Sequence, residues 1–195
     1  MTKVIGLSEK EKIILLYIAR ESIESALRGR SPRIPEDLPP KLLEPYGAFV
    51  TLQKHGQLRG CIGTFHAEEP LYKVVFEMAR SAAFNDPRFP PVTLEELPEI
   101  EIEISVLSPM WRGRPEDVQV GVHGIYIVRG VYRGVLLPQV AVEYGWDRET
   151  FLDHTCLKAG LPPGCWRDPE TEIYLFTAEI FSERELGLRP STQAH

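Results

Sequence analysis

Apolar and polar residues alternate most regularly over residues 99–104, where each isoleucine follows a glutamate. Successive side chains of a strand point to opposite faces, so this pattern predicts a strand with one buried and one hydrated face. One-sided burial is typical of an antiparallel sheet. The glutamates are expected to form the hydrated face, and a metal-binding role for them is the disfavoured alternative.

Two pairs of β-favourable segments are joined by short turn sequences and predict hairpins. The first pair is residues 48–53 with residues 58–62, and the second is residues 124–129 with residues 134–137. Glycine-containing turns between such segments favour antiparallel pairing. A last strand is expected over residues 173–181.

Three helices are predicted from the residues at which they begin. Ser8 and Glu11 have the spacing of a capping box for the first helix. Pro70 lies near the start of the second, where its fixed φ angle suits the first turn. Asp147 is the expected N-cap of a third helix over residues 148–159.

These elements together predict an α+β fold, because helices are mixed with hairpins and no βαβ rhythm is present. We expect a mainly antiparallel sheet with flanking helices in one compact domain of two lobes, residues 1–188. The proline-rich residues 31–45 are expected to run extended over the surface. Residues 189–195 are expected to form a frayed tail.

Composition and charge narrow the classes of function. Apolar residues make up 43% and charged residues 26% of the 195 residues, which is typical of a soluble globular protein with no membrane association. The formal net charge of −6 disfavours a surface that binds nucleic-acid phosphates.

The numbers of cysteine, asparagine and proline residues give expectations for the cellular location and the source organism. Three widely spaced cysteines do not indicate a disulfide framework, and no secretory signal is apparent, so a cytoplasmic location is expected. Asn85 is the only asparagine, and the chain holds 17 prolines. Few thermolabile amides and many prolines favour a thermophilic source.

The first candidate for chemistry is Cys61, which lies in the strand of the first hairpin. In a regular strand Arg59 and Cys61 share one face, and a fixed cation beside a thiol favours the thiolate. Gly60 and Gly63 leave room for a ligand or for another backbone. The alternative is a buried strand with a structural cysteine and glycines at a bulge.

A nucleophilic cysteine usually has a partner base, and two histidines are candidates. His66 follows the strand closely, and His123 lies between glycines where a loop can approach a cleft. The alternative for each is an exposed loop residue.

Asp86 and Arg88 form a second candidate group, in a proline-held loop after the second helix. Arg88 can present a planar donor fork to a carboxylate or phosphate of a substrate. In the structural alternative Asp86 ends the helix and pairs with Arg88. We expect this loop to line one cleft with Cys61.

Gln139 is a third candidate because it follows Pro138 within an apolar segment. A proline there predicts a bulge or an edge strand, which can aim the Gln139 amide at a substrate. An ordinary kink of an edge strand is the alternative.

No metal or cofactor is predicted. His154, Cys156 and Cys165 are too loosely spaced for a zinc motif, and Cys156 is expected to pack in the core. The glycines around Cys61 lack the lysine and the strand–loop–helix setting of a phosphate-binding loop.

Several segments resemble the AMMECR domain family, named after a protein of the Alport-syndrome deletion region. The resemblance covers nearly the whole chain and rests on five motifs. They are Leu58-Arg59-Gly60-Cys61-Ile62-Gly63, Ala82-Ala83-Phe84-Asn85-Asp86-Pro87-Arg88-Phe89, Gly121-Val122-His123-Gly124-Ile125, Leu137-Pro138-Gln139-Val140 and Lys158-Ala159-Gly160-Leu161.

The resemblance implies partners more than it implies a reaction, because the family has no established biochemical activity. Prokaryotic members are grouped with a radical-SAM-type protein and a dioxygenase-like protein. This chain has no cluster-binding cysteine triad, so any radical chemistry would belong to that partner. Nucleic-acid binding has also been suggested for the family.

Three hypotheses for function follow. The first is a small enzyme or enzyme subunit, a transferase or hydrolase that uses Cys61 with Arg59, Arg88 and a histidine on a small-molecule or protein substrate. The second is a protein-binding adaptor in which Cys61 is structural. Nucleic-acid binding is third, because the chain is acidic.

Overall fold

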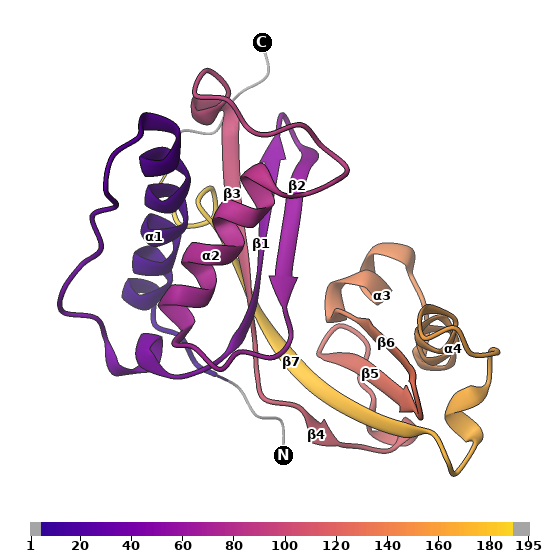
Figure 1. Cartoon of the computed structure of the whole chain (residues 1–195). Helices are drawn as coiled ribbons and strands as arrows, with labels where there is room; N and C mark the ends of the chain where they lie inside the picture. Colours follow the sequence, from indigo (N-terminus) through magenta and orange to yellow (C-terminus); the bar gives the residue numbers. More distant parts are fainter. Residues whose placement is uncertain (1–4, 189–195) are drawn as a thin grey trace. The chain divides into compact units, whose positions relative to one another are not determined.

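The protein is described by a computed structural model that covers residues 5–188 (Figure 1). It divides into two compact units, which are described separately. The larger unit contains residues 5–107 and 179–188, and the smaller contains residues 108–178. The α+β fold, with antiparallel strands and flanking helices, is confirmed. The predicted tail, residues 189–195, lies outside the described residues.

The larger unit begins with helix α1 (Glu9–Arg28), whose capping box is confirmed. Ser8 Oγ accepts from the Glu11 amide at 3.1 Å, and Glu11 Oε1 accepts from the Ser8 amide at 2.8 Å. Helix α2 (Leu71–Phe84) follows Pro70, as predicted. Both helices pack on one another and cover one face of the sheet (Figure 1).

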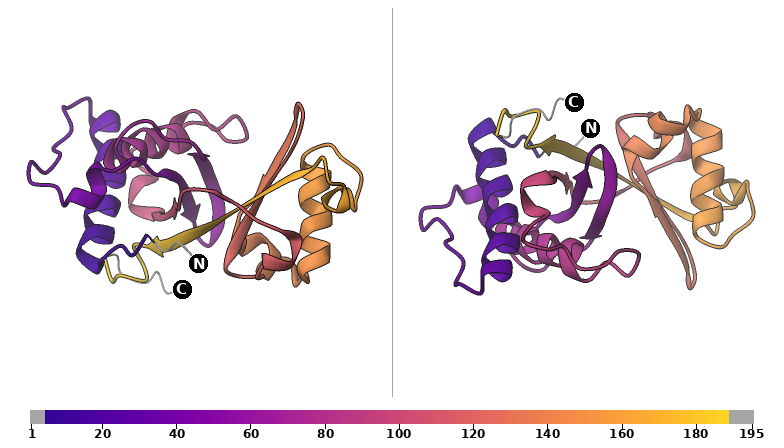
Figure 2. Two further views of the ribbon diagram at one scale, coloured as in Figure 1. Left: turned by 90° about the horizontal axis from the view of Figure 1, so that it is seen from below. Right: turned by 90° about the horizontal axis from the view of Figure 1, so that it is seen from above.

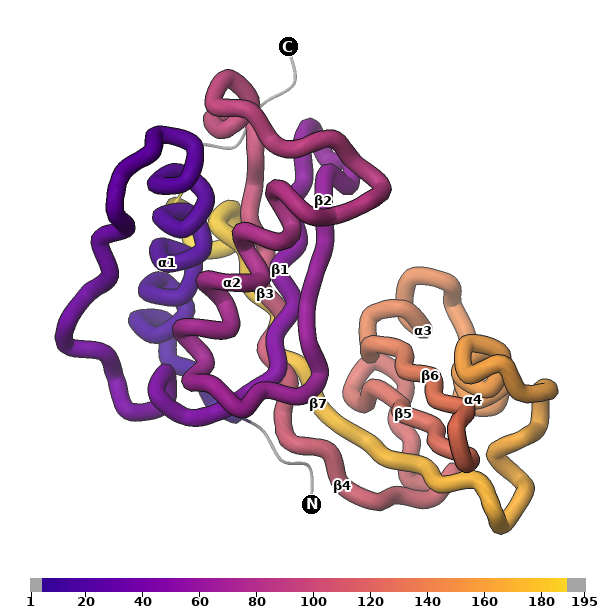
Figure 3. The backbone as a smooth tube through the Cα atoms, in the orientation of Figure 1, coloured from indigo at the N-terminus to yellow at the C-terminus, as the bar shows by residue number. Residues whose placement is uncertain are grey.

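Between α1 and β1 (Gly47–Lys54) the chain follows the surface, as predicted for residues 31–45 (Figure 3). Residues 30–39 have no regular secondary structure, and a short 3-10 helix, η1 (Pro40–Leu43), follows them. Leu42 is the buried anchor of this segment. Its side chain holds an otherwise mostly exposed connection against the core.

The sheet of the larger unit contains strands β1 (Gly47–Lys54), β2 (Gln57–Thr64) and β3 (Ile100–Leu107) in the order β2–β1–β3. The predicted first hairpin is confirmed. His55 and Gly56 have φ angles of 52° and 76°, the left-handed conformations of a two-residue hairpin turn. The isoleucines of β3 are buried, also as predicted, and a 3-10 turn, η2 (Leu97–Glu99), precedes them.

The smaller unit is built on strands β5 (His123–Arg129) and β6 (Tyr132–Leu136), the second predicted hairpin. Beside β5 lies β7 (Glu172–Ser182), which also pairs with the short β4 (Trp111–Arg112). The residues of β7 from Glu179 onward belong to the larger unit.

Two helices complete the smaller unit, namely α3 (Pro138–Tyr144) and α4 (Arg148–Lys158). The predicted cap of α4 is confirmed, since Asp147 Oδ1 accepts from the Thr150 amide at 2.8 Å. Helix α4 packs against β5 and β6 (Figure 2). Short 3-10 turns, η3 (Pro115–Asp117) and η4 (Cys165–Arg167), connect these elements.

Two predictions for this unit are wrong. Pro138 does not kink an edge strand; β6 ends at Leu136 and Pro138 is the first residue of α3. A proline suits that position because the first helical residues need no amide donor. The second wrong prediction is the absence of a disulfide framework. Cys156 is buried, as predicted, but it forms a disulfide with Cys165, because the turn after α4 folds back and brings η4 against the helix.

Candidate functional site

Cys61 lies in β2, directly opposite Thr51 of β1, and is the free cysteine of the chain. Its side chain is partly exposed. The hydroxyl of Thr51 donates to Cys61 Sγ at 3.2 Å. The Cys61 amide donates to Asp86 Oδ2 at 3.0 Å. The cysteine is therefore held through both its side chain and its main chain.

Asp86 follows the end of α2, and only 2% of its side chain is exposed. Its Oδ1 accepts from the amide and from Nε of Arg88, both at 3.0 Å, and its Oδ2 accepts from Arg88 Nη2 at 2.8 Å and from Cys61. These bonds, with that to the Arg88 guanidinium first, hold the pKa of Asp86 well below its ordinary range, against the opposing effect of burial. The carboxylate is therefore ionised and fully bonded.

The guanidinium of Arg88 lies next to the main chain of Cys61. Its Nη2 also donates to the main-chain oxygen of Cys61, at 3.4 Å. The side chain is 55% exposed, so part of the donor fork can reach a ligand. The predicted proximity of Asp86 and Arg88 to Cys61 is thus observed. Asp86 also follows the end of α2 and pairs with Arg88, as the structural alternative predicted.

Arg59 does not lie beside Cys61 on a regular strand face, contrary to the prediction. Gln53 pairs with Leu58 but Leu52 pairs with Gly60, so Arg59 is the extra residue of a β-bulge. Its guanidinium forms a two-pronged ion pair with Glu96, with Nε–Oε1 and Nη2–Oε2 distances of 3.0 and 3.2 Å. This pair lowers the pKa of Glu96 to about 2.

Two further residues of this cluster, besides the threonine at the sulfur, were missed by sequence reasoning. Phe89 lies between two cations, with its ring centre 5.9 Å from Cζ of Arg59 and 5.5 Å from Cζ of Arg88. Glu96 has a capping-box spacing to Thr93, which was the only available signal for it. Its Oε2 accepts from the Thr93 amide at 2.9 Å and also bonds to Arg59.

The two glycines of the motif allow close packing. A Cβ atom at Gly60 would lie 2.2 Å from the main-chain oxygen of Ala82 in α2, and one at Gly63 would lie 2.2 Å from the ring of Phe49. The space beside both glycines is therefore filled by protein atoms and leaves no room for a ligand there. At Gly60 the neighbouring atom belongs to the backbone of α2, one of the two neighbours expected at these glycines.

His66 is an exposed residue just beyond β2, and its main-chain oxygen accepts from the Thr64 hydroxyl at 2.9 Å. The hydrogen bonds described above join Cys61 to Thr51 at its sulfur and to Asp86 and Arg88 at its main chain. The exposed-loop alternative therefore describes the position of His66.

His123 belongs to the smaller unit, where it begins β5 and is only 5% exposed. The exposed-loop alternative is therefore wrong for this histidine. Its Nδ1 accepts from the Gln119 amide at 3.0 Å, which leaves the proton of the neutral ring on Nε2. Burial is the main cause that lowers the pKa of His123, although the charge and main chain of Asp117 oppose it.

A polar pocket of about 500 Å³ adjoins His123. The His123 ring meets Trp111 edge to face, with ring centres 5.6 Å apart. Carboxylates, a guanidinium and a neutral imidazole thus surround one space. The remaining lining residues are Arg112, Glu116, Asp117, Gln119 and Leu175.

Gln139 also belongs to the smaller unit, as the second residue of α3. Its Oε1 atom is buried and accepts no hydrogen bond from residues 5–188. A buried amide oxygen without a donor is costly, so the atom is available to a ligand or a water molecule. His123 and Gln139 both belong to the smaller unit, whereas Cys61, Asp86 and Arg88 belong to the larger one.

His154, Cys156 and Cys165 have partners within the protein. Cys156 and Cys165 are bonded to each other, and the His154 ring stacks on Trp146 with centres 3.9 Å apart. Across residues 5–188 no group of three or more histidine, cysteine or acidic side chains is arranged to hold a metal ion. In the same range, no helix has the length and apolar character needed to cross a bilayer.

Comparison with known protein families matches residues 16–181 to AMMECR1. The chain belongs to the AMMECR1 family. The resemblance seen in the sequence motifs is thus confirmed, and all five motifs lie within the matched residues.

Archaeal members of the AMMECR1 family are similar over most of their length. A protein of Methanothermobacter thermautotrophicus is 51% identical over 93% of this chain and 98% of its own. A protein of Pyrococcus furiosus is 51% identical over 87% of this chain and 86% of its own. The crystal structure of uncharacterized protein PH0010 from Pyrococcus horikoshii is 45% identical, with a TM-score of 0.82 over 94% of this chain and 96% of that one.

Proposed function

We propose that this AMMECR1-family protein is an enzyme, or a subunit of one, in which Cys61 is the nucleophile of a transferase or hydrolase. The observation that carries the proposal is the Asp86 carboxylate. It is almost fully buried, yet it binds both the Cys61 amide and the Arg88 guanidinium. Orienting a partly exposed thiol and a partly exposed donor fork around one point is a typical arrangement for a substrate site.

Each residue has a role in this proposal. The Cys61 thiolate attacks an electrophilic carbon, so that a carbon–sulfur bond forms as the bond to the leaving group breaks and the leaving group takes a proton. Water or an acceptor then cleaves the carbon–sulfur bond and regenerates the thiol. Arg88 binds an anionic group of the substrate, Thr51 orients the sulfur, and Asp86 is a positioning residue.

In this proposal a histidine accepts the proton of the Cys61 thiol. His66 and His123 are the candidates for this role, and Gln139 is a candidate to orient the substrate in the smaller unit. Arg59 acts indirectly, because its pair with Glu96 and its contact with Phe89 support the loop that carries Arg88.

Alkylation of the native protein with iodoacetamide tests the proposal. Because Cys156 and Cys165 are paired, the wild-type chain has one free thiol and needs no cysteine background mutations. We expect Cys61 in the folded protein to react at pH 7 at least as fast as glutathione, and Cys61→Ser to remove the signal. Reaction only after unfolding would make Cys61 structural and leave the adaptor hypothesis, with a radical-SAM-type or dioxygenase-like partner.

A cytoplasmic location and a thermophilic source belong to the same proposal. Disulfides are rare in the cytosol of mesophiles but are common in intracellular proteins of hyperthermophilic archaea. A cytoplasmic protein of a mesophile would rarely contain the bond between Cys156 and Cys165. If the protein is cytoplasmic, the disulfide therefore favours a thermophilic source.

A further inference from the structure

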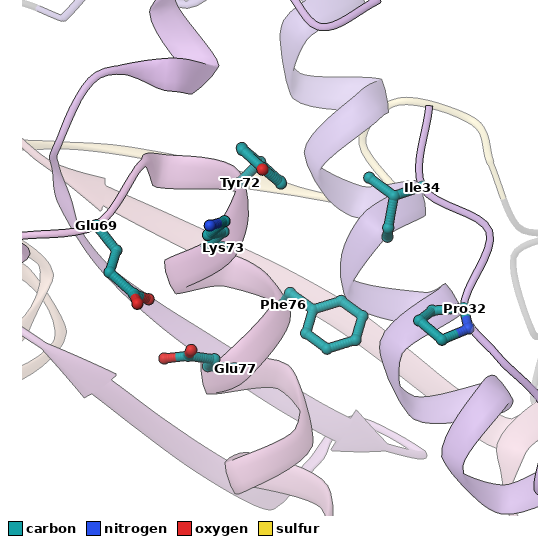
Figure 4. A pocket seen from close by; sticks show the side chains of 7 residues that line it. All are labelled: Pro32, Ile34, Glu69, Tyr72, Lys73, Phe76 and Glu77. Atoms are coloured by element: carbon teal, nitrogen blue, oxygen red, sulfur yellow. The ribbon is translucent and has the colours of Figure 1, made fainter. Parts of the chain in front are cut away.

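An apolar pocket of about 360 Å³ opens on the larger unit, and its lining contains none of the residues assigned to Cys61 chemistry (Figure 4). It lies between the first half of α2 and the surface segment that follows α1. Its apolar walls come from both sides, and its lining is Pro32, Ile34, Glu69, Tyr72, Lys73, Phe76 and Glu77.

Hydrogen bonds to α1 hold both walls in place. On the α2 side, Ser22 Oγ donates to the main-chain oxygen of Phe76 at 2.7 Å, and the Arg80 guanidinium lies 4.6 Å from the Phe76 ring centre. On the other side, the Tyr17 hydroxyl donates to the main-chain oxygen of Arg33 at 3.1 Å. A pocket fixed in this way can accept an apolar group with little reorganisation.

The charged residues of the rim are Glu69, Lys73 and Glu77, so negative charge is in excess. The carboxyl groups of Glu69 and Glu77 turn towards each other (Figure 4). Partial desolvation, and then the charge of Glu69 and a hydrogen bond with it, raise the pKa of Glu77 above its ordinary value, while Lys73 opposes this. The nearby Arg80 donates to Ser22 and Ser25 of α1, so it does not neutralise the two glutamates.

We propose that this pocket is a docking site for a partner protein segment in which an aromatic or branched aliphatic side chain is next to a lysine or arginine. The apolar side chain fills the space between Ile34 and Phe76. The neighbouring cation lies against Glu69 and Glu77, where it relieves the repulsion between the two carboxylates. This surface is independent of the proposed Cys61 chemistry.

Titration with short capped peptides, followed by 1H–15N NMR, tests the proposal. The probes are Gly-Phe-Lys-Gly, Gly-Phe-Glu-Gly and Gly-Ala-Lys-Gly. We expect the Phe-Lys peptide alone to shift the amides of residues 33–34, 69 and 71–77, with millimolar affinity. Equal binding of the Phe-Glu peptide, or no shift by the Phe-Lys peptide, would overturn the proposal.

Variants of the pocket provide the controls. Glu77→Gln is expected to weaken binding about three-fold, within the range of an exposed ion pair, and Ile34→Ser to abolish it without altering the core. Glu68→Gln changes a neighbouring exposed acid that does not line the pocket, so it should bind as the wild type does. Equal effects of Glu68→Gln and Glu77→Gln, or self-association that Ile34→Ser abolishes, would contradict docking of a separate basic partner.

Discussion

At the scale of single residues, the candidate site depends on Asp86. The carboxylate joins a strand residue to a loop residue that is 27 positions later in the chain, Cys61 to Arg88. It is buried, ionised and bonded by four donors, so neither partner can turn away without leaving an uncompensated charge. Sequence spacing could predict the Asp86–Arg88 pair, which is local. It could not predict that the fold brings the Cys61 amide to the same carboxylate.

Asp86→Asn tests this role. The amide nitrogen of asparagine is a donor and would face the donors of Arg88 or Cys61, so we expect unfolding free energy to fall by about 2–3 kcal/mol. Urea unfolding at pH 7 measures the change. Asp117→Asn is the matched control, because Asp117 pairs with Arg114 at the surface, and its effect should be clearly smaller. Similar losses of unfolding free energy for the two variants would show that the site does not depend on Asp86.

At the scale of elements, the bulge in β2 determines what Cys61 contacts. The register that pairs Gln53 with Leu58 would, if continued, place Cys61 opposite Val50. The extra residue Arg59 moves its partner to Thr51, which supplies the hydroxyl at the sulfur. The hairpin could be predicted from alternation and its turn. The bulge could not, because the contacts made there, of Gly60 with α2 and of Arg59 with Glu96, join residues that are far apart in the sequence.

Gly60→Ala tests the packing of β2 against α2. The new methyl group would meet the Ala82 main-chain oxygen, and a helix backbone cannot move aside as a side chain can. We expect a loss of about 2–3 kcal/mol in unfolding free energy, measured by denaturant titration. The nearest atoms that Gly63→Ala would meet belong to the Phe49 side chain, which can turn aside, so its loss should be smaller. The reverse order would show that α2 adapts.

The acid stability of the Arg59–Glu96 pair is a second prediction at this scale. The pKa of Glu96 is lowered to about 2 from an ordinary value of 4.5. Its stabilising contribution is therefore complete above about pH 4.5 and is lost as the pH falls towards 2. The stability difference between the wild type and Glu96→Gln should shrink over that interval. If this difference in unfolding free energy stayed constant from pH 6 to pH 2, the ion pair between Arg59 and Glu96 would not stabilise the fold.

At the scale of the whole molecule, motifs that are spread along the chain predicted the family, and the order of helices and hairpins predicted the α+β class. The same reasoning missed the disulfide between Cys156 and Cys165. An odd cysteine count says nothing about which pair is close, and their contact depends on how the turn after α4 folds back. For the same reason, sequence could nominate His66 and His123 but could not assign either one to Cys61.

The disulfide should stabilise the smaller unit. Cross-linking two cysteines nine residues apart lowers the conformational entropy of the unfolded chain. This raises the free energy of unfolding by about 2–3 kcal/mol. Thermal unfolding with and without reductant measures this, and the Cys156→Ala, Cys165→Ala double variant should be insensitive to reductant. Thiol titration of the unfolded, unreduced protein should find one thiol per chain. Three thiols would disprove the bond.

The most direct measurement for the central claim compares iodoacetamide rates of Cys61 at pH 7 in the wild type, Arg88→Gln and Arg114→Gln. Arg114 is an exposed arginine paired with an aspartate in the smaller unit, so it is the matched control. If Arg88 and Asp86 prepare the thiol for chemistry, Arg88→Gln should slow labelling about three- to ten-fold while Arg114→Gln leaves it unchanged. Equal rates in all three proteins would contradict the assignment of Cys61, Asp86 and Arg88 to one reactive site.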